Sequence, residues 1–255
     1  MPEPAIEFRE VLFTTPQGRV LLDKITLSIA SGTTVAILGR SGSGKTTLLR
    51  TVNRMIEPTS GQVFVQGKQI GQGDPIFLRR GIGYVVQEIG LFPHFRIERN
   101  IGIVLELEGR PKDQVHTRTQ ELMTMVDLDP KQFAGRYPHQ LSGGQRQRVG
   151  LARALAADPP ILLMDEPFGA LDPLTRAEMQ DVLRNLLAGL NKTVLLVTHD
   201  LDEAMYLASR IILIEEGQVA ADLPSKAFLN SNIPAVQQYV KAVHRGVDAA
   251  QTRQP

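Results

Sequence analysis

The sequence predicts an α/β protein built on a mostly parallel sheet that is covered by helices. Short apolar runs bounded by turns or charges recur along the chain, at residues 34–38, 82–86, 161–164 and 193–197. Such runs are typical of strands buried on both faces, as parallel strands are. Between residues 87 and 160 the pattern becomes mainly helical, which indicates a helical insertion into the α/β core.

The N-terminal part of the chain predicts an antiparallel β edge. Ile6–Phe13 and Ile25–Ile29 alternate apolar and polar residues, as half-exposed strands do. A turn-rich segment, 15–18, lies between them. The two segments therefore predict a pair of antiparallel strands joined by a short turn.

Helices are expected after the strand at 34–38 and within the insertion. Lys45–Met55 carries helix-forming residues directly after a glycine-rich loop. One helix of the insertion should include Glu121–Val126, and another should cover Gln145–Ala157. The last residues, 246–255, are rich in Ala and Gln and predict a frayed tail.

Composition narrows the function classes. The chain has 255 residues, of which 42% are hydrophobic and 22% charged, as in ordinary globular proteins. Its net charge of +1 gives no global reason to expect binding to nucleic acid or to an anionic membrane. The absence of cysteine excludes disulfides, cysteine-based zinc sites and thiol catalysis.

No targeting or membrane-spanning segment is expected. The start of the chain has neither a basic region nor an apolar run of the kind found in secretory signals. The longest stretch without a charged residue, Ile25–Gly39, includes Ser, Thr and Gly and is shorter than the roughly 20 apolar residues of a spanning helix. We therefore expect a soluble chain whose membrane role, if it has one, depends on a partner.

A phosphate-binding loop is predicted at Gly39–Thr46. Its glycines allow successive backbone N–H groups to point inward at a phosphate, at the positive end of the following helix dipole. Lys45 would reach the β- and γ-phosphates, and the Thr46 hydroxyl would ligate Mg²⁺. The alternative is a glycine turn before a helix with an accidental Lys-Thr pair. The full set of expected nucleotide ligands from this segment is Gly39, Arg40, Ser41, Gly42, Ser43, Gly44, Lys45, Thr46 and Thr47.

Two adjacent carboxylates follow the apolar run at 161–164. Asp165 and Glu166 stand at the carboxyl end of this expected strand, where ligands bind in open α/β sheets. Asp165 would hold Mg²⁺, and Glu166 would accept a proton from the attacking water as general base. A strand that ends in two solvated acids is the simpler alternative, which the other motifs make improbable.

Taken together, these motifs resemble the nucleotide-binding domain of ATP-binding cassette transporters. The resemblance covers about Ile6–Val240 and is carried by the following segments in this order: Gly39–Thr46, Gln87, Leu141–Gln145, Ile161–Glu166, Ala170–Asp172 and His199. It implies an ATP hydrolase with a P-loop RecA-like core, an antiparallel β edge and an inserted helical subdomain. One domain would span 1–245, with the core at 1–88 and 160–245 and the helical subdomain at 89–159.

The resemblance also implies a head-to-tail homodimer with two ATP molecules at its interface. Ser142, Gly143 and Gly144, followed by Gln145, would open a helix that offers N–H groups and a hydroxyl to the γ-phosphate of the opposite subunit. Asp172 would lie at the dimer interface near the partner's phosphate loop. A helix N-cap before Pro173 is an alternative role for Asp172 and is compatible with the first.

Two further catalytic positions are implied by the same resemblance. Gln87 would contact Mg²⁺ and the attacking water while moving with the helical subdomain. His199, which follows the strand at 193–197, would hold the γ-phosphate. The remaining histidines are expected to be surface or packing residues; they are His94, His116, His139 and His244.

The sequence departs from the family pattern at the adenine. The family stacks an aromatic ring on the base from the first β edge, and the spacing back from Gly39 places Thr15 there. Phe13 lies two residues earlier on the same strand face and would substitute if its ring were correctly placed. The alternative is that a shorter polar residue leaves adenine weakly held.

The segment after Gln87 points to a transporter. Glu88–Phe95 places apolar and aromatic side chains in an expected surface loop, where the family docks a coupling helix of the membrane subunit. Packing within the helical subdomain is the alternative. The amino-acid sequence of this segment resembles that of the importer branch for glycine betaine, choline and related quaternary amines. That branch often adds a regulatory C-terminal pair of domains, for which a chain ending near Pro255 leaves no room.

The resemblance therefore implies the ATPase subunit of an importer on the cytoplasmic face of the inner membrane. Expected partners are separate transmembrane permease subunits and an extracytoplasmic solute-binding protein, without nucleic acid. Two alternatives stay open: a soluble cassette ATPase of cofactor-cluster assembly, and the ATPase of an exporter or lipid transporter.

Overall fold

The computed structural model describes residues 4–87 and 89–251, the residues 244–251 for their backbone only. The chain forms two compact units. The first unit comes from residues up to Gln72 and from Leu195 onward, and the second is Gly73–Val194. No helix in the described ranges is long and apolar enough to cross a membrane.

The antiparallel β edge predicted at the N-terminus is confirmed in the first unit. Its sheet has the order β2-β1-β4-β5. The strands are β1 (Pro4–Thr14), β2 (Val20–Ala30), β4 (Ser60–Val65) and β5 (Lys68–Gln69). Ile6 pairs with Ile29 and Phe8 with Leu27, so that buried side chains of both strands lie on one face. The alternation read from the sequence thus marks the face that packs into the core.

A second group of strands in the first unit carries the predicted parallel sheet. Its order is β10-β9-β3-β8, with β3 (Thr34–Leu38) parallel to β9 (Arg210–Glu215) and β10 (Gln218–Pro224) antiparallel to β9. The strand β8 (Thr193–Val197) begins in the second unit and ends in the first. The bounds of β3 and β8 are those expected from their apolar runs, because both strands are buried along nearly their whole length.

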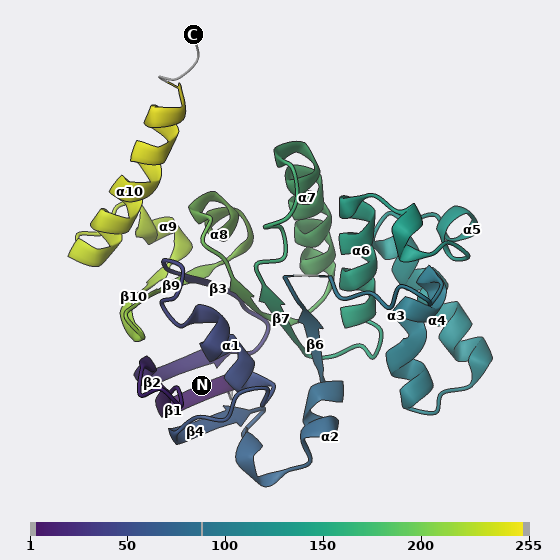
Figure 1. Cartoon of the computed structure of the whole chain (residues 1–255), viewed down its shortest axis with the longest axis horizontal. Coiled ribbons are helices and arrows are strands. Elements are labelled where there is room, and N and C mark those ends of the chain that lie inside the picture. Colours follow the sequence, from purple (N-terminus) through teal and green to yellow (C-terminus); the bar gives the residue numbers. More distant parts are fainter. Residues whose placement is uncertain (1–3, 88, 252–255) are drawn as a thin grey trace. The chain divides into compact units, whose positions relative to one another are not determined.

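Among the described residues of the first unit, helices and a short 3-10 turn, η1 (Ile70–Gln72), accompany the strands (Figure 1). Helix α1 (Lys45–Val52) packs on β2 and β4, and α8 (Leu201–Leu207) packs on β3. Near the C-terminus, α9 (Ser225–Phe228) contacts β9 and β10, and α10 contacts β10. Helix α10 runs from Pro234 to Gln251, so helix continues into the segment where a frayed tail was expected.

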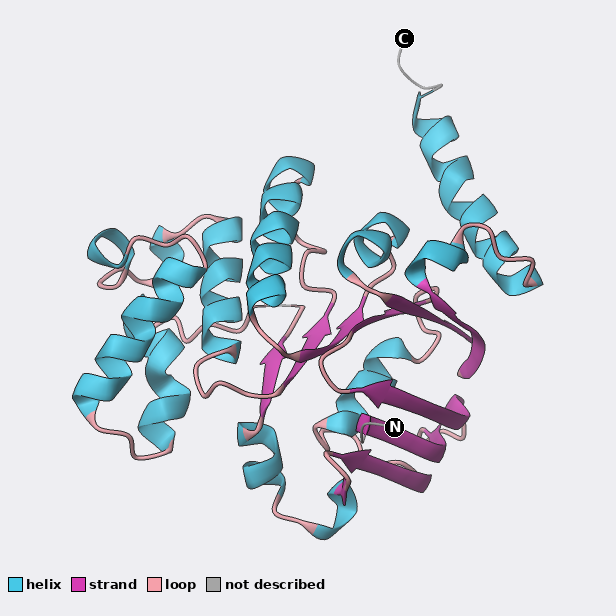
Figure 2. Ribbon diagram, turned by 180° about the vertical axis from the view of Figure 1, so that it is seen from behind, coloured by secondary structure: helices cyan, strands magenta, loops and turns pink. Residues whose placement is uncertain are grey.

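The second unit combines two parallel strands with the helical insertion (Figure 2). Its strands β6 (Ile82–Val85) and β7 (Ile161–Asp165) pair directly. Helices α3, α4 and α6 pack on one another, and α6 also contacts α7. The helices and the second 3-10 turn are α2 (Pro75–Arg80), α3 (Ile97–Leu107), α4 (Lys112–Met125), α5 (Pro130–Phe133), η2 (Pro138–Gln140), α6 (Gly143–Ala154) and α7 (Pro173–Gly189).

The C-terminal helices are held to the first unit by a local apolar core. Phe228 is fully buried there, and Leu38, Leu213 and Tyr239 belong to the same cluster. The neighbouring Leu229, by contrast, is 50% exposed. The short helix α9 therefore supplies the largest fully buried side chain of this cluster, and α10 adds Val236 and Tyr239 to it.

Replacing Phe228 by Ala should lower the free energy of unfolding by about 3–5 kcal/mol, because it leaves a cavity where a large ring was fully buried. The matched control Leu229→Ala should cost less than about 1 kcal/mol, since that side chain is half in solvent already. Urea denaturation followed by circular dichroism measures both. Equal effects of the two variants would show that the cluster does not hold α9 in place.

Candidate functional site

The loop between β3 and α1 is compressed between two strands of the first unit. At Gly39, where φ is 153°, an added Cβ would lie 2.3 Å from the carbonyl oxygen of Ile214 on β9. At Gly44, where φ is 104°, it would lie 2.3 Å from the carbonyl oxygen of Leu21 on β2. Only glycine fits such an approach and such backbone angles without displacing the strands. The loop is therefore fixed at both ends.

Lys45 stabilises the curved backbone of this loop by hydrogen bonds to its carbonyl oxygens. Its Nζ donates to the carbonyl oxygens of Gly39 at 2.8 Å and Arg40 at 2.9 Å, and the side chain is buried. Ser43 is also buried, and its Oγ has no hydrogen-bond partner in the part of the chain that the structure describes. Helix α1 starts at Lys45, where helix N–H groups and the helix dipole favour an anion. The arrangement suits a bound phosphate.

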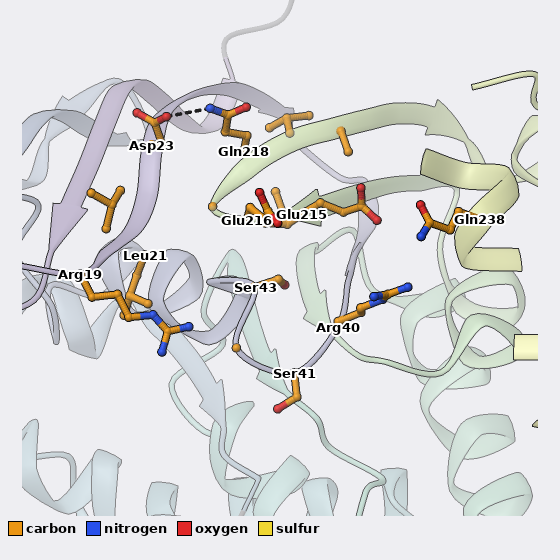
Figure 3. A pocket seen from close by; sticks show the side chains of 16 residues that line it. Arg19, Leu21, Asp23, Arg40, Ser41, Ser43, Glu215, Glu216, Gln218 and Gln238 are labelled. Atoms are coloured by element: carbon orange, nitrogen blue, oxygen red, sulfur yellow. Dashed lines mark hydrogen bonds between the residues drawn. The ribbon is translucent and has the colours of Figure 1, made fainter. Parts of the chain in front are cut away.

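A cavity of about 960 Å³ opens beside the loop, within the first unit (Figure 3). The loop contributes Arg40–Ser43 to its wall. Arg19, in the turn before β2, and Val20 and Leu21 at the start of β2 also line it, as does Glu215–Gln218 at the turn between β9 and β10. Asp23, also in the wall, accepts a hydrogen bond from Gln218 Nε2 at 2.7 Å. Sequence reasoning did not find Arg19, because nothing in the linear pattern places residue 19 against residue 42.

Phe13 does not line this cavity. It pairs with Leu22 across the β1–β2 ladder and is half-buried, and it is not among the residues of the cavity wall. Thr15, at the expected position of the ring, lies at the end of β1 where the chain turns. The structure thus gives no support to Phe13 as a ring facing the cavity.

His199 follows β8 in the first unit and is exposed. The Tyr239 hydroxyl of α10 donates to the His199 carbonyl oxygen at 2.8 Å. Beside it, the buried Thr198 donates from its backbone N–H to the Ile37 carbonyl oxygen at 3.1 Å. The C-terminal helix therefore positions the segment that carries His199, although residue 239 lies far along the sequence.

The two carboxylates lie in the second unit at the end of β7. Asp165 is 2% exposed, and the Tyr84 hydroxyl donates to its Oδ2 at 3.4 Å. Glu166 is half-buried and has φ of 45°, the left-handed conformation that non-glycine residues rarely adopt. Such backbone conformations concentrate at functional sites. The sharp turn sends the chain away from the strand directly after the second carboxylate.

Ser142 caps helix α6 in the second unit. Its Oγ accepts from the Gln145 N–H at 3.2 Å, while Gln145 Oε1 accepts from the Ser142 N–H at 3.0 Å. This reciprocal capping box fixes the helix start. At Gly144 an added Cβ would lie 2.4 Å from Thr175 Cγ2 on α7. A side chain there would push the two helices apart.

The start of α6 is also tied to the segment after the carboxylates. Gln147, buried on α6, donates from Nε2 to the Pro167 carbonyl oxygen. Because Pro167 follows Glu166 directly, this bond links the Ser142 helix to the turn that holds the general-base candidate. The second unit thus presents the capped helix and the carboxylates as one packed assembly.

Asp172 is the N-cap of α7, with Pro173 as the first helical residue. Its Oδ1 accepts from the Thr175 N–H at 3.1 Å. Hydrogen bonds from the Thr175 side chain and backbone hold the pKa of Asp172 below its ordinary value of 3.8. The capping role read from the Asp-Pro pair is therefore present in the structure.

Gln87 lies in the bend after β6 and is exposed, and the next residue, Glu88, lies outside the described residues. Three of the histidines expected to be surface or packing residues are exposed. His94 contacts the Phe95 ring, His116 contacts the Glu98 carboxylate and His139 stacks on Tyr137. The His244 side chain lies outside the described part.

The site residues thus fall into two sets. The first unit holds the phosphate loop and His199, and the second holds Gln87, the Ser142 helix, Asp165, Glu166 and Asp172. The profile of the family described as "ABC transporter" matches residues 22–169, which contain the loop, the capped helix and the carboxylates. The chain belongs to the ABC transporter family.

Curated relatives agree with this membership. The chain is 46% identical over 224 residues to OpuCA, the "glycine betaine/carnitine/choline transport ATP-binding protein" of Bacillus subtilis (strain 168), covering 88% of this chain and 59% of OpuCA. It is 49% identical over 202 residues to OpuBA, the "choline transport ATP-binding protein" of the same organism, covering 79% of this chain and 53% of OpuBA. The chain therefore spans little more than half the length of these relatives.

A solved structure supports the same fold. The ATP-binding cassette MJ0796, in a dimeric post-hydrolysis state bound to ADP and Pi, superposes with a TM-score of 0.78 at 34% identity. The match covers 86% of this chain and 98% of MJ0796. The cassette ATPase fold expected from the sequence is confirmed.

The cap at Asp172 predicts a pH dependence. Because its pKa is lower in the folded than in the unfolded chain, its stabilising contribution is present above about pH 3.8 and is lost as pH falls through the folded pKa. NMR titration of the Asp172 carboxyl carbon should give a midpoint below 3.8. Thr175→Val should raise that midpoint, whereas Thr175→Ser, which keeps the hydroxyl, should not. A midpoint unchanged in Thr175→Val would rule out the threonine hydroxyl as its cause.

Proposed function

We propose that the chain is the ATP-hydrolysing subunit of an ABC importer. The observation that carries this proposal is the pair of carboxylates at the end of β7, packed with the capped Ser142 helix in the family to which the chain belongs. A phosphate loop alone would support only nucleotide binding. A buried Asp followed by a half-buried Glu adds a metal ligand and a base, which hydrolysis needs.

The residues divide the work of hydrolysis as follows. The phosphate loop binds the phosphates through its N–H groups and Lys45. Glu166 accepts the proton of the attacking water, and His199 holds the γ-phosphate. Gln87 orients the water from the bend after β6. In this proposal the RecA-like core comprises residues 1–88 and 160–245, and the helical subdomain comprises residues 89–159.

Mg²⁺ suits the oxygen donors that the chain offers. Thr46 supplies a hydroxyl, Asp165 a carboxylate and Gln87 a carboxamide oxygen, and Mg²⁺ prefers such hard ligands together with substrate phosphates. Asp165 is buried and accepts a hydrogen bond from Tyr84, which orients its carboxylate. When bound, the ion would neutralise charge on the phosphates during hydrolysis.

We infer that two copies of the chain form each pair of ATP sites. Ser142 is exposed and caps the N-terminus of α6, and a helix N-terminus favours an anion. In a head-to-tail homodimer the Ser142–Gly144 segment would reach the γ-phosphate bound by the partner, and Asp172 would lie near the partner's loop. The dimeric state of MJ0796 supports this arrangement.

The proposed permease contact is the aromatic loop, residues 91–95. Phe92 is 41% exposed, and its ring lies 5.2 Å from that of Phe95. The buried Asn100 fixes the loop backbone: its Nδ2 donates to the carbonyl oxygens of Phe92 and Phe95, and its Oδ1 accepts from the Phe92 N–H. A rigid loop that keeps an aromatic ring in water suits a protein partner.

The base of the aromatic loop is anchored to α6. Arg153 donates to the carbonyl oxygens of Ile89 at 2.7 Å and Gly90 at 2.8 Å, and burial lowers its pKa from the ordinary value. Movement of the helix that carries Ser142 would therefore move the loop. This is a physical route by which ATP binding would reach membrane subunits.

Small quaternary amines are the proposed cargo. The names of OpuCA and OpuBA connect these relatives to glycine betaine, carnitine and choline transport. By that similarity we propose a permease and an extracytoplasmic solute-binding protein as partners, with the chain on the cytoplasmic face of the inner membrane. ATP binding would close the dimer, and hydrolysis would reopen it.

Glu166→Gln should leave MgATP affinity within about twofold but lower the rate of hydrolysis by about 100-fold or more, because the amide cannot accept the proton. Steady-state phosphate release and equilibrium binding measure the two quantities. Glu178→Gln, which changes an exposed carboxylate on α7, is the matched control and should keep the wild-type rate. Wild-type turnover of Glu166→Gln would refute the assignment of the base.

Phe92→Ala should weaken rebinding of the purified chain to urea-washed membrane vesicles of its source by about fivefold, because an exposed aromatic anchor is lost. ATP binding in solution should not change. Leu107→Ala on α3 removes another exposed apolar side chain, 63% exposed, and should rebind normally. Binding only to soluble assembly proteins would instead favour a cluster-assembly ATPase.

A further inference from the structure

Arg19 extends from the β1–β2 turn to the phosphate loop. One of its terminal nitrogens, Nη2, lies 3.9 Å from the position that a Cβ on Gly42 would take. Figure 3 shows its guanidinium directed toward the loop ribbon near Ser41 and Ser43, in the cavity of about 960 Å³. A cation from a distant part of the sequence thus stands where phosphates would bind.

The turn that carries Arg19 is braced by Thr15. The Thr15 N–H donates to the Arg19 carbonyl oxygen at 2.8 Å, and the Arg19 N–H donates to Thr15 Oγ1 at 3.2 Å. The Gly18 N–H closes the turn on the Thr15 carbonyl oxygen at 2.9 Å. Thr15 therefore anchors the backbone of Arg19 with its side chain as well as its main chain.

Arg19 differs from Lys45 in its availability. Lys45 is buried, and its ammonium already donates to two loop carbonyls. Arg19 is exposed, and its guanidinium has no ion-pair or hydrogen-bond partner within residues 4–87 and 89–251. Its planar fork of donors matches the oxygens of a phosphate.

The acidic side chains that the structure describes around the cavity form no ion pair with the Arg19 guanidinium. Asp23 accepts from Gln218, and neither Glu215 nor Glu216, both in the cavity wall, forms an ion pair with Arg19. Arg40 adds a second cation on the loop side of the wall. Because neither glutamate forms an ion pair with Arg19, its guanidinium is available to bind a negatively charged ligand.

We propose that Arg19 is a nucleotide-binding residue that contacts the triphosphate. The inference rests on the proposed ATPase function and adds a second phosphate cation to it. Because the side chain is exposed, it meets the incoming triphosphate at the loop and raises its rate of association. The chemistry recognised is polyphosphate, and the base makes no contact with this guanidinium.

The test compares binding of MgATP, MgGTP and tripolyphosphate to the full chain by calorimetry at several salt concentrations. Arg19→Gln should weaken MgATP and tripolyphosphate alike, by about five- to tenfold, and reduce the salt dependence of binding. Arg19→Lys keeps the charge and should lose only about two- to threefold. The ratio of ATP to GTP affinity should stay at its wild-type value.

Arg9→Gln is the matched control, since it removes an exposed arginine of β1 that does not line the cavity. Lys45→Ala separates the two proposals: if it abolishes binding while Arg19→Gln equals the wild type, the role of Arg19 is overturned and the ATPase proposal stands. Wild-type protein that binds no nucleotide overturns both. Loss of ATP affinity in Arg19→Gln with unchanged tripolyphosphate affinity would show a contact to the base, and would overturn the phosphate assignment.

Discussion

The close approach of the phosphate loop to two strands is the constraint on which the rest of the first unit depends. Gly39 lies against β9 and Gly44 against β2, in each case where a Cβ would meet a carbonyl oxygen at 2.3 Å. These contacts bring a strand of each sheet to the same loop. The loop leads directly into α1, so that the proposed phosphate binding rests on backbone N–H groups more than on any side chain.

The second unit also has a helix start at which a glycine allows close packing. Its helix α6 begins at a serine capping box, and Gly144 lets α7 pack close to the helix start. Gln147 links this helix to Pro167, next to the strained backbone of Glu166. One packed assembly thus carries the capped helix start and the two carboxylates that we propose for hydrolysis. Each unit alone lacks part of the chemistry, which explains why the proposed cycle needs both.

The sequence predicted those features that depend on local pattern. The bounds of β3 and β8 follow from short apolar runs, and the antiparallel edge follows from alternation in β1 and β2. The capping role of Asp172 follows from the Asp-Pro pair. These features need only neighbouring residues, and periodicity and turn chemistry report on neighbours.

Features that depend on distant contacts escaped the sequence. Tyr239 reaches the carbonyl of His199, and Arg19 reaches Gly42, but no motif connects these positions. The segment after residue 245 predicts a tail because it is rich in Ala and Gln, whereas α10 continues to Gln251. Phe13 pairs with Leu22 and is not among the residues of the cavity wall, so its stacking on adenine stays a prediction. The cavity itself is a product of three segments and could not be inferred from any one of them.

The central claim is that each ATP site is shared between two copies of the chain, and mixing two inactive variants tests it most directly. Lys45→Ala removes the ammonium group of the phosphate loop, and Ser142→Ala removes the hydroxyl that caps α6. Each variant alone should therefore hydrolyse ATP poorly. In a mixed dimer one site has an intact Lys45 from one chain and an intact Ser142 from the other. With random pairing, the equimolar mixture should recover about a quarter of the wild-type rate. A mixture no more active than the variants alone would contradict the shared site.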